Sequence, residues 1–508
     1  MKRIFLHSLF LLFFVLSSRA QNGNMLWNNI LIHDIRLDFS YPSFYDTLIA
    51  NHSLDVYTNC DITIDGTVVS SVGAKFKGNS SFNNPSRKKS IKIDLNEFVS
   101  GQDYDGIKKI NLNNGFKDPS FLREKVALDF MNNHSIAAPR CAYARVYMNG
   151  IYWGLFTLVE EVNNDFCDRI FGSSSGNRFK GDPSGDFRWY GSADTAYYRR
   201  YELDNNETLN DWSDLVNLIN TVNNSSAAQF QTGIDSVFNA NNFIRHWAID
   251  NLFVNLDSYI GSGHNYYIYD ESVTGKFEWI HWDVNEAFGN FQMNQSLTQL
   301  KTLPYNYVNM MTNRPLCAKM LANPVYHQQL KDELCLLNAD FDTTMMNSYI
   351  DSLASEIRPD VYADTLKTYT NQQFENNVNA DISIPSPGGS QWLAGIKSFI
   401  AERHTSLFSQ LNATGACVTA SVPDLLQAGS LELFPNPATQ IVHVKIPEDC
   451  VTDASMLQIM DLSGRTFLST RITGELMPIK LELLSNGLYL VRCSTKKGVF
   501  ISKLIVSK

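Results

Sequence analysis

The hydrophobic periodicity of this chain changes along its length, and those changes limit the folds it can adopt. Between residues 25 and 100, apolar and polar residues alternate in runs such as HDIRLDF and DITIDGTVV, which is typical of strands. Residues 210–255 and 315–411 have helical spacing. From residue 431 onward, short alternating runs return. The sequence therefore predicts an α+β arrangement with a β-rich front and a helical back, followed by a small all-β sandwich of the immunoglobulin-like kind.

The first twenty residues, MKRIFLHSLFLLFFVLSSRA, predict a signal peptide. Lys2 and Arg3 form a basic start, and an apolar run extends from Ile4 to Leu16. Ser18-Arg19-Ala20 places small residues where a signal peptidase needs them, so cleavage is expected before Gln21. No later segment has about 18 uninterrupted apolar residues. We therefore expect an exported chain whose mature form has no transmembrane segment.

The same changes of pattern set the expected domains. The signal peptide occupies residues 1–20, a large domain residues 21–420, a polar linker residues 421–430 and a domain of short strands residues 431–508. The net charge of −10 argues against a nucleic-acid partner, because such proteins usually present a basic face.

The eight cysteines include no CxxC or CxxH spacing, which argues against a zinc site. Export permits disulfides. A pairing of Cys317 with Cys335 is one candidate to test, and a pairing of Cys450 with Cys493 would lie within the C-terminal domain.

Residues 72–95, VGAKFKGNSSFNNPSRKKSIKIDL, predict two strands joined by a loop of small residues. Backbone N–H groups of such a loop, which starts at Lys77-Gly78-Asn79-Ser80, suit a phosphate, and Lys89 and Lys92 add positive charge. The alternative is a solvated hairpin with a basic edge, and the segment alone leaves both interpretations open.

Two further elements follow this hairpin. Asp118-Pro119-Ser120 signals the start of a helix that carries Glu124 in its first turn. Asn149-Gly150 predicts a β-hairpin that ends in Glu160 and Glu161.

Residues 251–291 concentrate the groups that suit metal and phosphate chemistry. The stretch is interpreted as strand, turn and strand, with Asp257 after one apolar run, Asn265 at the start of a second and Asp283 after a third. His264 and His281 flank these aspartates but lack the close HxH or HxxxH spacing of a metallohydrolase.

The C-terminal segment resembles the type A sorting domain of the type IX, or Por, secretion system. The residues that carry the resemblance are Phe434-Pro435-Asn436-Pro437-Ala438, Asp461-Leu462-Ser463-Gly464-Arg465, Asn486-Gly487-Leu488-Tyr489 and Lys503-Leu504-Ile505-Val506. The resemblance implies recognition by the type IX machinery and export to the medium or to the outer membrane and cell surface.

Residues 30–411 resemble the spore-coat CotH kinase family. The motifs that carry the resemblance are KFKGNSS, KKSIKIDL, DPSFLREKVALDF, ARVYMNGIYWGLFTLVEEV, NRFKGD, the Asp257–Asn265 segment and HWDVNEAFG. The family implies an atypical protein-kinase-like fold that transfers phosphate from ATP, with Mg²⁺ or Mn²⁺, to Ser or Thr of secreted proteins.

The resemblance also implies roles for individual residues. Asp257 is the expected catalytic residue on the acceptor, Lys89 the phosphate-binding lysine with Lys92 as second choice, and Glu124 its carboxylate partner. The expected metal ligands are Asp283, Asn265 and Asn285. The expected ATP-binding residues are Lys77, Gly78, Asn79, Ser80, Lys89, Lys92 and Glu160, of which Glu160, with Glu161, is expected near the base or hinge.

Two positions depart from the family pattern. Many members have a second acid where this chain has Asn285, and an amide offers an oxygen ligand without charge. Lys77 stands where the family often has arginine, which loses bidentate phosphate geometry. Besides the kinase, two interpretations stay open: a non-catalytic surface or adhesion protein, and a hydrolase that acts on phosphates or glycans with the same carboxylates.

Overall fold

The computed structural model describes residues 22–27, 31–386, 389–417, 431–446, 456–460, 466–472, 474–481, 484, 487–495 and 498–508. The chain divides into two compact units, Met1–Cys417 and Val418–Lys508. The predicted signal peptide and linker lie outside the described residues. Among the residues that are described, no helix combines the length and the apolar composition that a membrane span requires.

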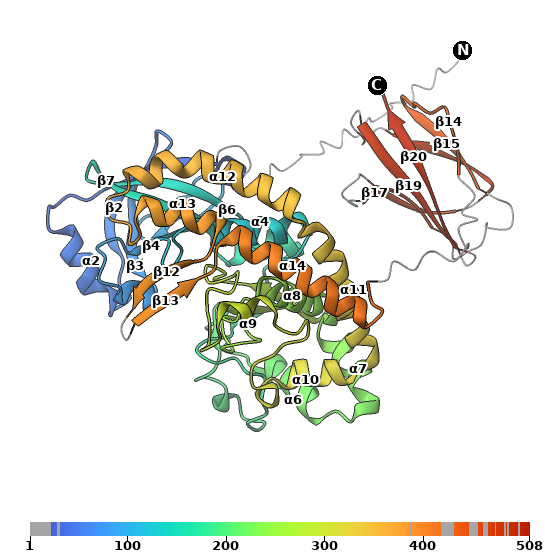
Figure 1. Ribbon diagram of the computed structural model, residues 1–508, viewed down its shortest axis with the longest axis horizontal. Coiled ribbons are helices and arrows are strands. Elements are labelled where there is room, and N and C mark those ends of the chain that lie inside the picture. Colours follow the sequence, from blue (N-terminus) through green and yellow to red (C-terminus); the bar gives the residue numbers. More distant parts are fainter. Residues whose placement is uncertain are drawn as a thin grey trace, which may run out of the picture. The chain divides into compact units, whose positions relative to one another are not determined.

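A closed barrel forms the front of the first unit (Figure 1). Its strands follow the order β1-β2-β3-β4-β5-β7-β6, with β1 parallel to β6 and the other neighbours antiparallel. Their bounds are β1 (Ile32–Asp38), β2 (Thr58–Ile64), β3 (Thr67–Lys77), β4 (Ser90–Asp94), β5 (Lys109–Asn113), β6 (Cys141–Met148) and β7 (Ile151–Glu160). The predicted alternation is confirmed, since along β2 Cys60, Ile62 and Ile64 are buried and the residues between them are not. The predicted turn at Asn149-Gly150 joins β6 to β7, and a turn at Asp65-Gly66 joins β2 to β3.

Helices form the back of the first unit around a second hydrophobic core. The longer ones are α4 (Arg123–Asn133), α5 (Asn164–Phe171), α6 (Ser213–Asn224), α7 (Ala227–Val237), α8 (Ala240–Phe253), α10 (Pro315–Ala322), α11 (Pro324–Asp340), α12 (Thr343–Ala363), α13 (Asn371–Asn379) and α14 (Ile396–Ala413). Helices α1 (Asn24–Trp27), α2 (Phe44–His52) and α3 (Ser80–Asn83) pack instead against the barrel core. The remaining elements are α9 (Leu297–Lys301) and the 3₁₀ turns η1 (Asp194–Ala196) and η2 (Met311–Asn313). The α+β class expected from the sequence is confirmed for this unit at the level of a β-rich front and a helical back.

Helix α8 leads into the central stretch. The side chain of Asn239 caps its start by accepting from the backbone N–H of Asn242, and Val254 ends it in a left-handed conformation with φ of 49°. Residues 251–253 complete α8, as the helical spacing of residues 210–255 predicts, so the apolar run before Asp257 is not a strand.

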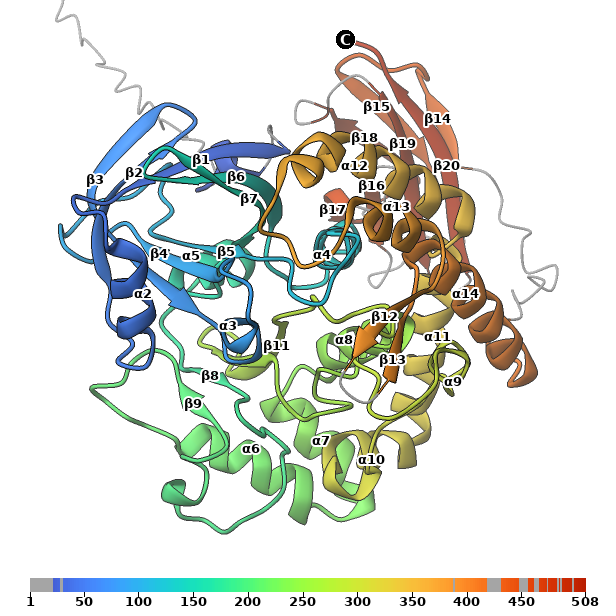
Figure 2. The same cartoon turned by 60° about the vertical axis from the view of Figure 1, so that its left-hand side comes forward.

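A small sheet lies between the barrel and helices α6 and α7 (Figure 2). Its order is β11-β10-β8-β9, with the bounds β8 (Arg178–Lys180), β9 (Glu202–Leu203), β10 (Tyr266–Glu271) and β11 (Lys276–His281). The β10–β11 hairpin matches the second and third apolar runs of the central stretch. A separate hairpin pairs β12 (Ile382–Ser386) with β13 (Gly389–Leu393).

The second unit is all-β in its described residues. One sheet has the order β14-β15-β18 and the other β17-β16-β19-β20. The bounds are β14 (Glu432–Phe434), β15 (Ile441–Lys445), β16 (Met456–Met460), β17 (Thr466–Arg471), β18 (Leu476–Lys480), β19 (Gly487–Thr495) and β20 (Gly498–Val506). Val442 and Val444 of one sheet share a core with Leu457 and Val491 of the other, so the expected all-β character is confirmed.

A disulfide joins Cys335 to Cys417, with 5.4 Å between their Cα atoms. This corrects the candidate pairing of Cys317 with Cys335, because Cys317 is a buried thiol of α10. Cys450 lies outside the described residues, so its pairing with Cys493 stays a prediction.

A buried ion pair fixes the segment after α12 to the barrel. Lys88 Nζ lies 2.6 Å from Asp364 Oδ2, and the two side chains are 2% and 0% exposed. The same ammonium donates to the carbonyl oxygen of Leu155 on β7 at 2.5 Å. Removing one partner would leave the other charge buried without compensation, which costs far more than losing a surface pair.

We expect Asp364→Ala to lower the free energy of unfolding by about 3–5 kcal/mol, since Lys88 stays buried. The control is Glu375→Ala, because Glu375 pairs with Arg358 at 2.6 Å but both side chains are partly exposed. That change should cost less than about 1 kcal/mol. Urea denaturation measures both costs, and similar values would contradict the importance of the buried pair.

Candidate active site

A cleft of about 660 Å³ is lined by barrel strands on one side and by β8, β10 and the loop after β11 on the other. A smaller inner pocket of about 60 Å³ shares Lys77, Asp283 and Asn285 with the cleft and reaches Glu124. Every expected site residue except Lys89 and Glu160 lines one or both of these spaces.

Strand register places several polar side chains on the cleft face of the barrel. Lys92 lies opposite Lys75 in the β3–β4 pair and opposite Asn111 in the β4–β5 pair. Directly opposed residues point to the same face, and Lys77, at the next alternate position after Lys75, joins them. Phe76, between the two lysines, is buried in the barrel core.

Lys77 is the lysine at the centre of this group. Its Nζ donates to Asn111 Oδ1 at 2.8 Å, and Asn111 in turn donates to Glu161 Oε2 at 2.5 Å. Lys92 Nζ lies 2.6 Å from Glu161 Oε1. Burial lowers the pKa of Lys77, while the carboxylates of Glu161 and Asp283 act in the opposite direction. Burial alone would raise the pKa of Glu161, but the two lysines hold it below its ordinary value.

The chain turns sharply after Lys77. Gly78 has φ of 89°, and a Cβ atom there would lie 2.1 Å from Ser81 Oγ, so only glycine fits without a shift of Ser81. The turn brings Gly78, Asn79 and Ser80 to the wall of the cleft, as expected for phosphate-binding residues.

Lys89 and Glu160 are not brought to the cleft. Lys89 precedes β4, and its Nζ donates to the carbonyl oxygen of Phe82 at 2.6 Å and to that of Asn84, so it closes the loop onto itself. Glu160 pairs with Arg140 at 2.7 Å and with Arg169 at 2.6 Å. Neighbouring residues of an extended chain point to opposite faces, which is why Glu161 faces the cleft and Glu160 does not.

Glu124 lies at the start of α4, in the inner pocket. Asn113 Nδ2 donates to both of its carboxyl oxygens, at 2.8 and 3.0 Å. Burial and the nearby carboxylate of Asp283 raise the pKa of Glu124 to about 8, although Asn113 and Lys77 act to lower it. Glu124 therefore shares an electrostatic environment with Lys77 and Asp283.

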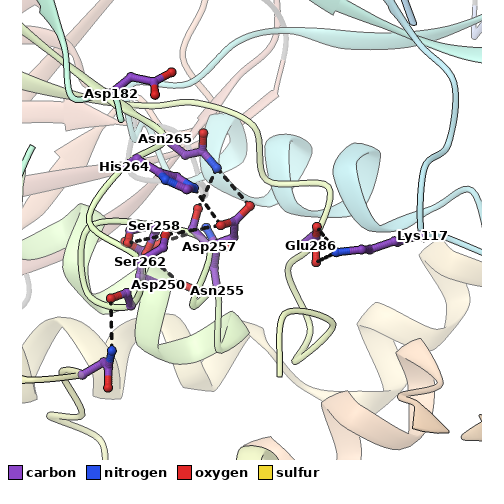
Figure 3. Close-up of polar contacts among 12 residues, drawn as sticks. Lys117, Asp182, Asp250, Asn255, Asp257, Ser258, Ser262, His264, Asn265 and Glu286 are labelled. Atoms are coloured by element: carbon purple, nitrogen blue, oxygen red, sulfur yellow. Dashed lines mark hydrogen bonds and ion pairs between the residues drawn. The ribbon is translucent and has the colours of Figure 1, made fainter. Parts of the chain in front are cut away.

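Asp257 is surrounded by three side chains of its own loop (Figure 3). His264 Nε2 lies 2.8 Å from Asp257 Oδ1, and Ser262 Oγ donates to the same oxygen at 3.2 Å. Asn265 Nδ2 donates to Asp257 Oδ2 at 3.1 Å. Burial would lower the pKa of His264, but the hydrogen bond to Asp257 raises it above its ordinary value. The loop thus holds the Asp257 carboxylate in one orientation at the cleft.

Asp283 follows β11 and has φ of 52°, which turns its side chain away from the strand path. Its carboxylate has no hydrogen-bond partner among the described residues. Burial raises its pKa, Lys77 lowers it, and the negative charge of Asp257 raises it further. An unpaired carboxylate in this position is available to a cation.

Asp250 connects the loops that carry Asp257 and Asp283. It is 3% exposed at the end of α8. Asn255 Nδ2 donates to Asp250 Oδ1 at 3.0 Å, and His281 Nε2 lies 2.9 Å from the same oxygen (Figure 3 shows the contact with Asn255). One buried carboxylate therefore ties both loops to the same helix.

Two ion pairs in the cleft were assigned no role from the sequence. Lys117 Nζ lies 2.9 Å from Glu286 Oε1, and Lys180 Nζ lies 2.8 Å from Asp182 Oδ2. Burial raises the pKa of Glu286 to about 7, although Lys117 acts to lower it. The signals were present, because Glu286 belongs to HWDVNEAFG and the other pair to NRFKGD, but neither motif specifies which of its residues face a cleft.

The expected metal ligands are compatible with a hard divalent cation. Within the described residues, no group of three or more His, Cys, Asp or Glu side chains is placed to hold a metal ion. The expected set instead combines the carboxylate of Asp283 with two amides. The amide nitrogen of Asn265 donates to Asp257, which leaves its amide oxygen for another partner. Asn285 lines both the cleft and the inner pocket. Oxygen donors of this kind suit Mg²⁺ or Mn²⁺.

Comparison with known proteins identifies two regions. The family model described as CotH kinase protein matches residues 74–404, and the one described as secretion system C-terminal sorting domain matches residues 432–507. Inner spore coat protein H of Bacillus subtilis (strain 168) is 26% identical over 296 residues, which cover 57% of this chain and 78% of that protein. The sorting domain indicates export, with a secreted or cell-surface location.

Glu124→Gln tests the buried carboxyl of the inner pocket. The pKa of Glu124 is about 8 in the folded chain, whereas an unfolded glutamate has a pKa of about 4.3. As the pH rises between these values, the unfolded chain releases a proton that the folded chain keeps, so stability falls by about 1.4 kcal/mol per pH unit. We expect Glu124→Gln to remove this loss and to exceed the parent in stability by about 3–5 kcal/mol at about pH 9, but not at about pH 4.

Urea denaturation at the two pH values, without nucleotide or metal, measures the difference. Glu207→Gln is the control, because Glu207 is an exposed glutamate. A pH dependence that is the same in both variants would contradict the assignment.

Proposed function

Because this chain belongs to the CotH kinase family, we propose that its first unit is an atypical protein kinase that transfers phosphate from ATP to Ser or Thr of secreted or surface proteins. Its protein-kinase-like fold is part of the proposal: Lys77 ends strand β3 and Glu124 lies in the first turn of helix α4, and the charge of Glu124 acts on Lys77. Protein kinases likewise use a strand lysine and a helix glutamate.

One observation carries the proposal. A half-buried lysine, Lys77, and an unpaired carboxylate, that of Asp283, influence each other in a cleft that also contains Asp257. Phosphoryl transfer depends mainly on positioning and on neutralising charge, so a cation site beside a lysine is the arrangement it needs. A non-catalytic scaffold has no chemical reason to bury these charges together.

The side chains then take the following roles. Lys77 neutralises phosphate charge, held by Asn111 and Glu161. Backbone N–H groups of the turn at Gly78 bind phosphate oxygens. Asp283, Asn265 and Asn285 would hold the metal ion, which when bound neutralises charge on the phosphates.

Asp257 acts on the acceptor. The hydroxyl oxygen of the acceptor attacks the γ-phosphorus, the bond from that phosphorus to the β–γ bridging oxygen breaks, and ADP leaves. Asp257 orients the hydroxyl and accepts its proton as the new bond forms. His264 and Asn265 fix the orientation of this carboxylate. The proposal replaces Lys89 by Lys77 as the phosphate-binding lysine, because the ammonium of Lys89 is bound to loop carbonyls.

A non-catalytic surface protein is the second candidate, since the curated relative is named as a spore coat protein. The exported location fits both candidates. Asn285 favours this alternative, because it gives less negative charge to a metal than the acid that many family members have there.

Transfer of label is the direct test. We expect the purified chain, given labelled ATP, Mg²⁺ or Mn²⁺ and a generic protein acceptor, to label the acceptor on Ser or Thr. Asp283→Ala should reduce the rate by about 100-fold or more, as expected for the loss of one charge-stabilising group. No transfer by the parent, or an unchanged rate in Asp283→Ala, would refute the kinase.

The choice between the two lysines has a matched pair of variants. Lys77→Met should lower kcat/KM by about 100-fold, because it removes the positive charge that acts most strongly on the Asp283 carboxylate. Lys89→Met should lower the free energy of unfolding by about 1–3 kcal/mol, because two loop carbonyl groups lose their hydrogen-bond donor. It should change kcat/KM by less than about threefold. Steady-state kinetics and urea denaturation of both variants measure this, and the opposite ranking of rates would return the role to Lys89.

A further inference from the structure

A second cavity, of about 690 Å³, adjoins the cleft. Lys117, Glu286 and Phe291 line both spaces. We call this second cavity the β13 groove. Its far wall includes Ser390, Gln391 and Trp392 of β13 and residues at the start of α9. Figure 2 shows the β12–β13 hairpin beside α9. The groove therefore runs from the surface of the hairpin to the cleft that contains Asp257.

Each charged side chain that lines the β13 groove has a partner of opposite charge. These charged side chains are those of Lys117, Glu286 and Asp381. The first two pair with each other at 2.9 Å. Asp381 pairs at 2.7 Å with Lys301, which also pairs with Glu402 at 2.7 Å. The other polar side chains that line the groove are amides and hydroxyls: Asn290, Gln292, Asn294, Ser296, Thr298, Ser390 and Gln391. A ligand with unpaired charges would find no counterion there, so the groove favours an uncharged one.

Two groups in the β13 groove are left for a ligand. The side chain of Trp392 on β13 is 55% exposed, and Met293 and Leu297 line the same groove. Asn290 is 2% exposed, and its amide nitrogen donates to the carbonyl oxygen of Lys117 at 2.9 Å. Its amide oxygen has no hydrogen-bond partner among the described residues. A buried acceptor without a donor is costly, and a backbone N–H group of a bound peptide would satisfy it.

We propose that the β13 groove binds the acceptor protein as an extended, uncharged segment. An apolar side chain of that segment packs on Trp392, and a backbone N–H group donates to Asn290. Extended chains present alternate side chains to opposite sides, so one anchored residue fixes the register in which the Ser or Thr reaches Asp257. This inference rests on the proposed kinase function and adds the class of acceptor to it.

Binding selection tests the groove without requiring transfer. A bead-displayed library of peptides with a central Ser or Thr and random flanking residues is panned against the whole chain. We expect about tenfold enrichment of peptides that carry an apolar residue at one fixed distance from the central Ser or Thr, because an anchor residue in a pocket contributes much of the binding energy. These peptides should have no charged residue next to the apolar one. Trp392→Ala should abolish the enrichment. The control is Phe408→Ala, which removes an aromatic side chain of similar exposure, 52%, from α14 and should keep it.

The inference is overturned by enrichment of charged peptides, by enrichment that survives in Trp392→Ala, or by no enrichment at all. It is also overturned if the parent forms dimers that Trp392→Ala dissociates, because a second copy of the chain would then occupy the groove. Transfer of label from ATP to the enriched peptides is then measured separately. Enrichment without transfer would refute the kinase but keep the groove, whereas transfer that is insensitive to Trp392→Ala would refute the groove alone.

Discussion

The ammonium of Lys77 is the charge on which the cleft depends. It lies in the field of three carboxylates, those of Glu161, Asp283 and Glu124. Burial raises the pKa of both Glu124 and Asp283, and their mutual repulsion adds to this effect for Glu124. Such a cluster is unfavourable by itself, because desolvation of several like charges outweighs one ion pair. A divalent cation beside Asp283 would balance the excess and give Lys77 a phosphate as its partner.

The backbone explains how these charges are held in place. Asp250 fixes the loops after α8 and after β11 through Asn255 and His281. The barrel contributes the opposite wall as rigid strands, and register alone determines that Lys77 and Lys92 share a face. Sites built on strands and tied loops keep their geometry better than sites on free loops, which suits a reaction that depends on positioning.

The strands could be predicted from the sequence because alternation is a local property, as along β2, and the polar groups that follow apolar runs, Asp257 and Asp283, do line one cleft. The position of Lys89 outside the cleft could not be predicted. It depends on a loop that folds back, so that Lys89 binds carbonyl groups of its own hairpin. The disulfide of Cys335 was missed because its partner, Cys417, is distant in the sequence and only the packed helices bring them together.

The most direct measurement is a crystal structure of the whole chain with Mn²⁺ and a non-hydrolysable ATP analogue, using the anomalous signal of manganese to locate the metal. The account predicts an anomalous peak beside the Asp283 carboxylate, with the phosphates in contact with Lys77 and the turn at Gly78. Nucleotide bound elsewhere, or a peak away from Asp283, would contradict the assignment of this cleft as a kinase active site.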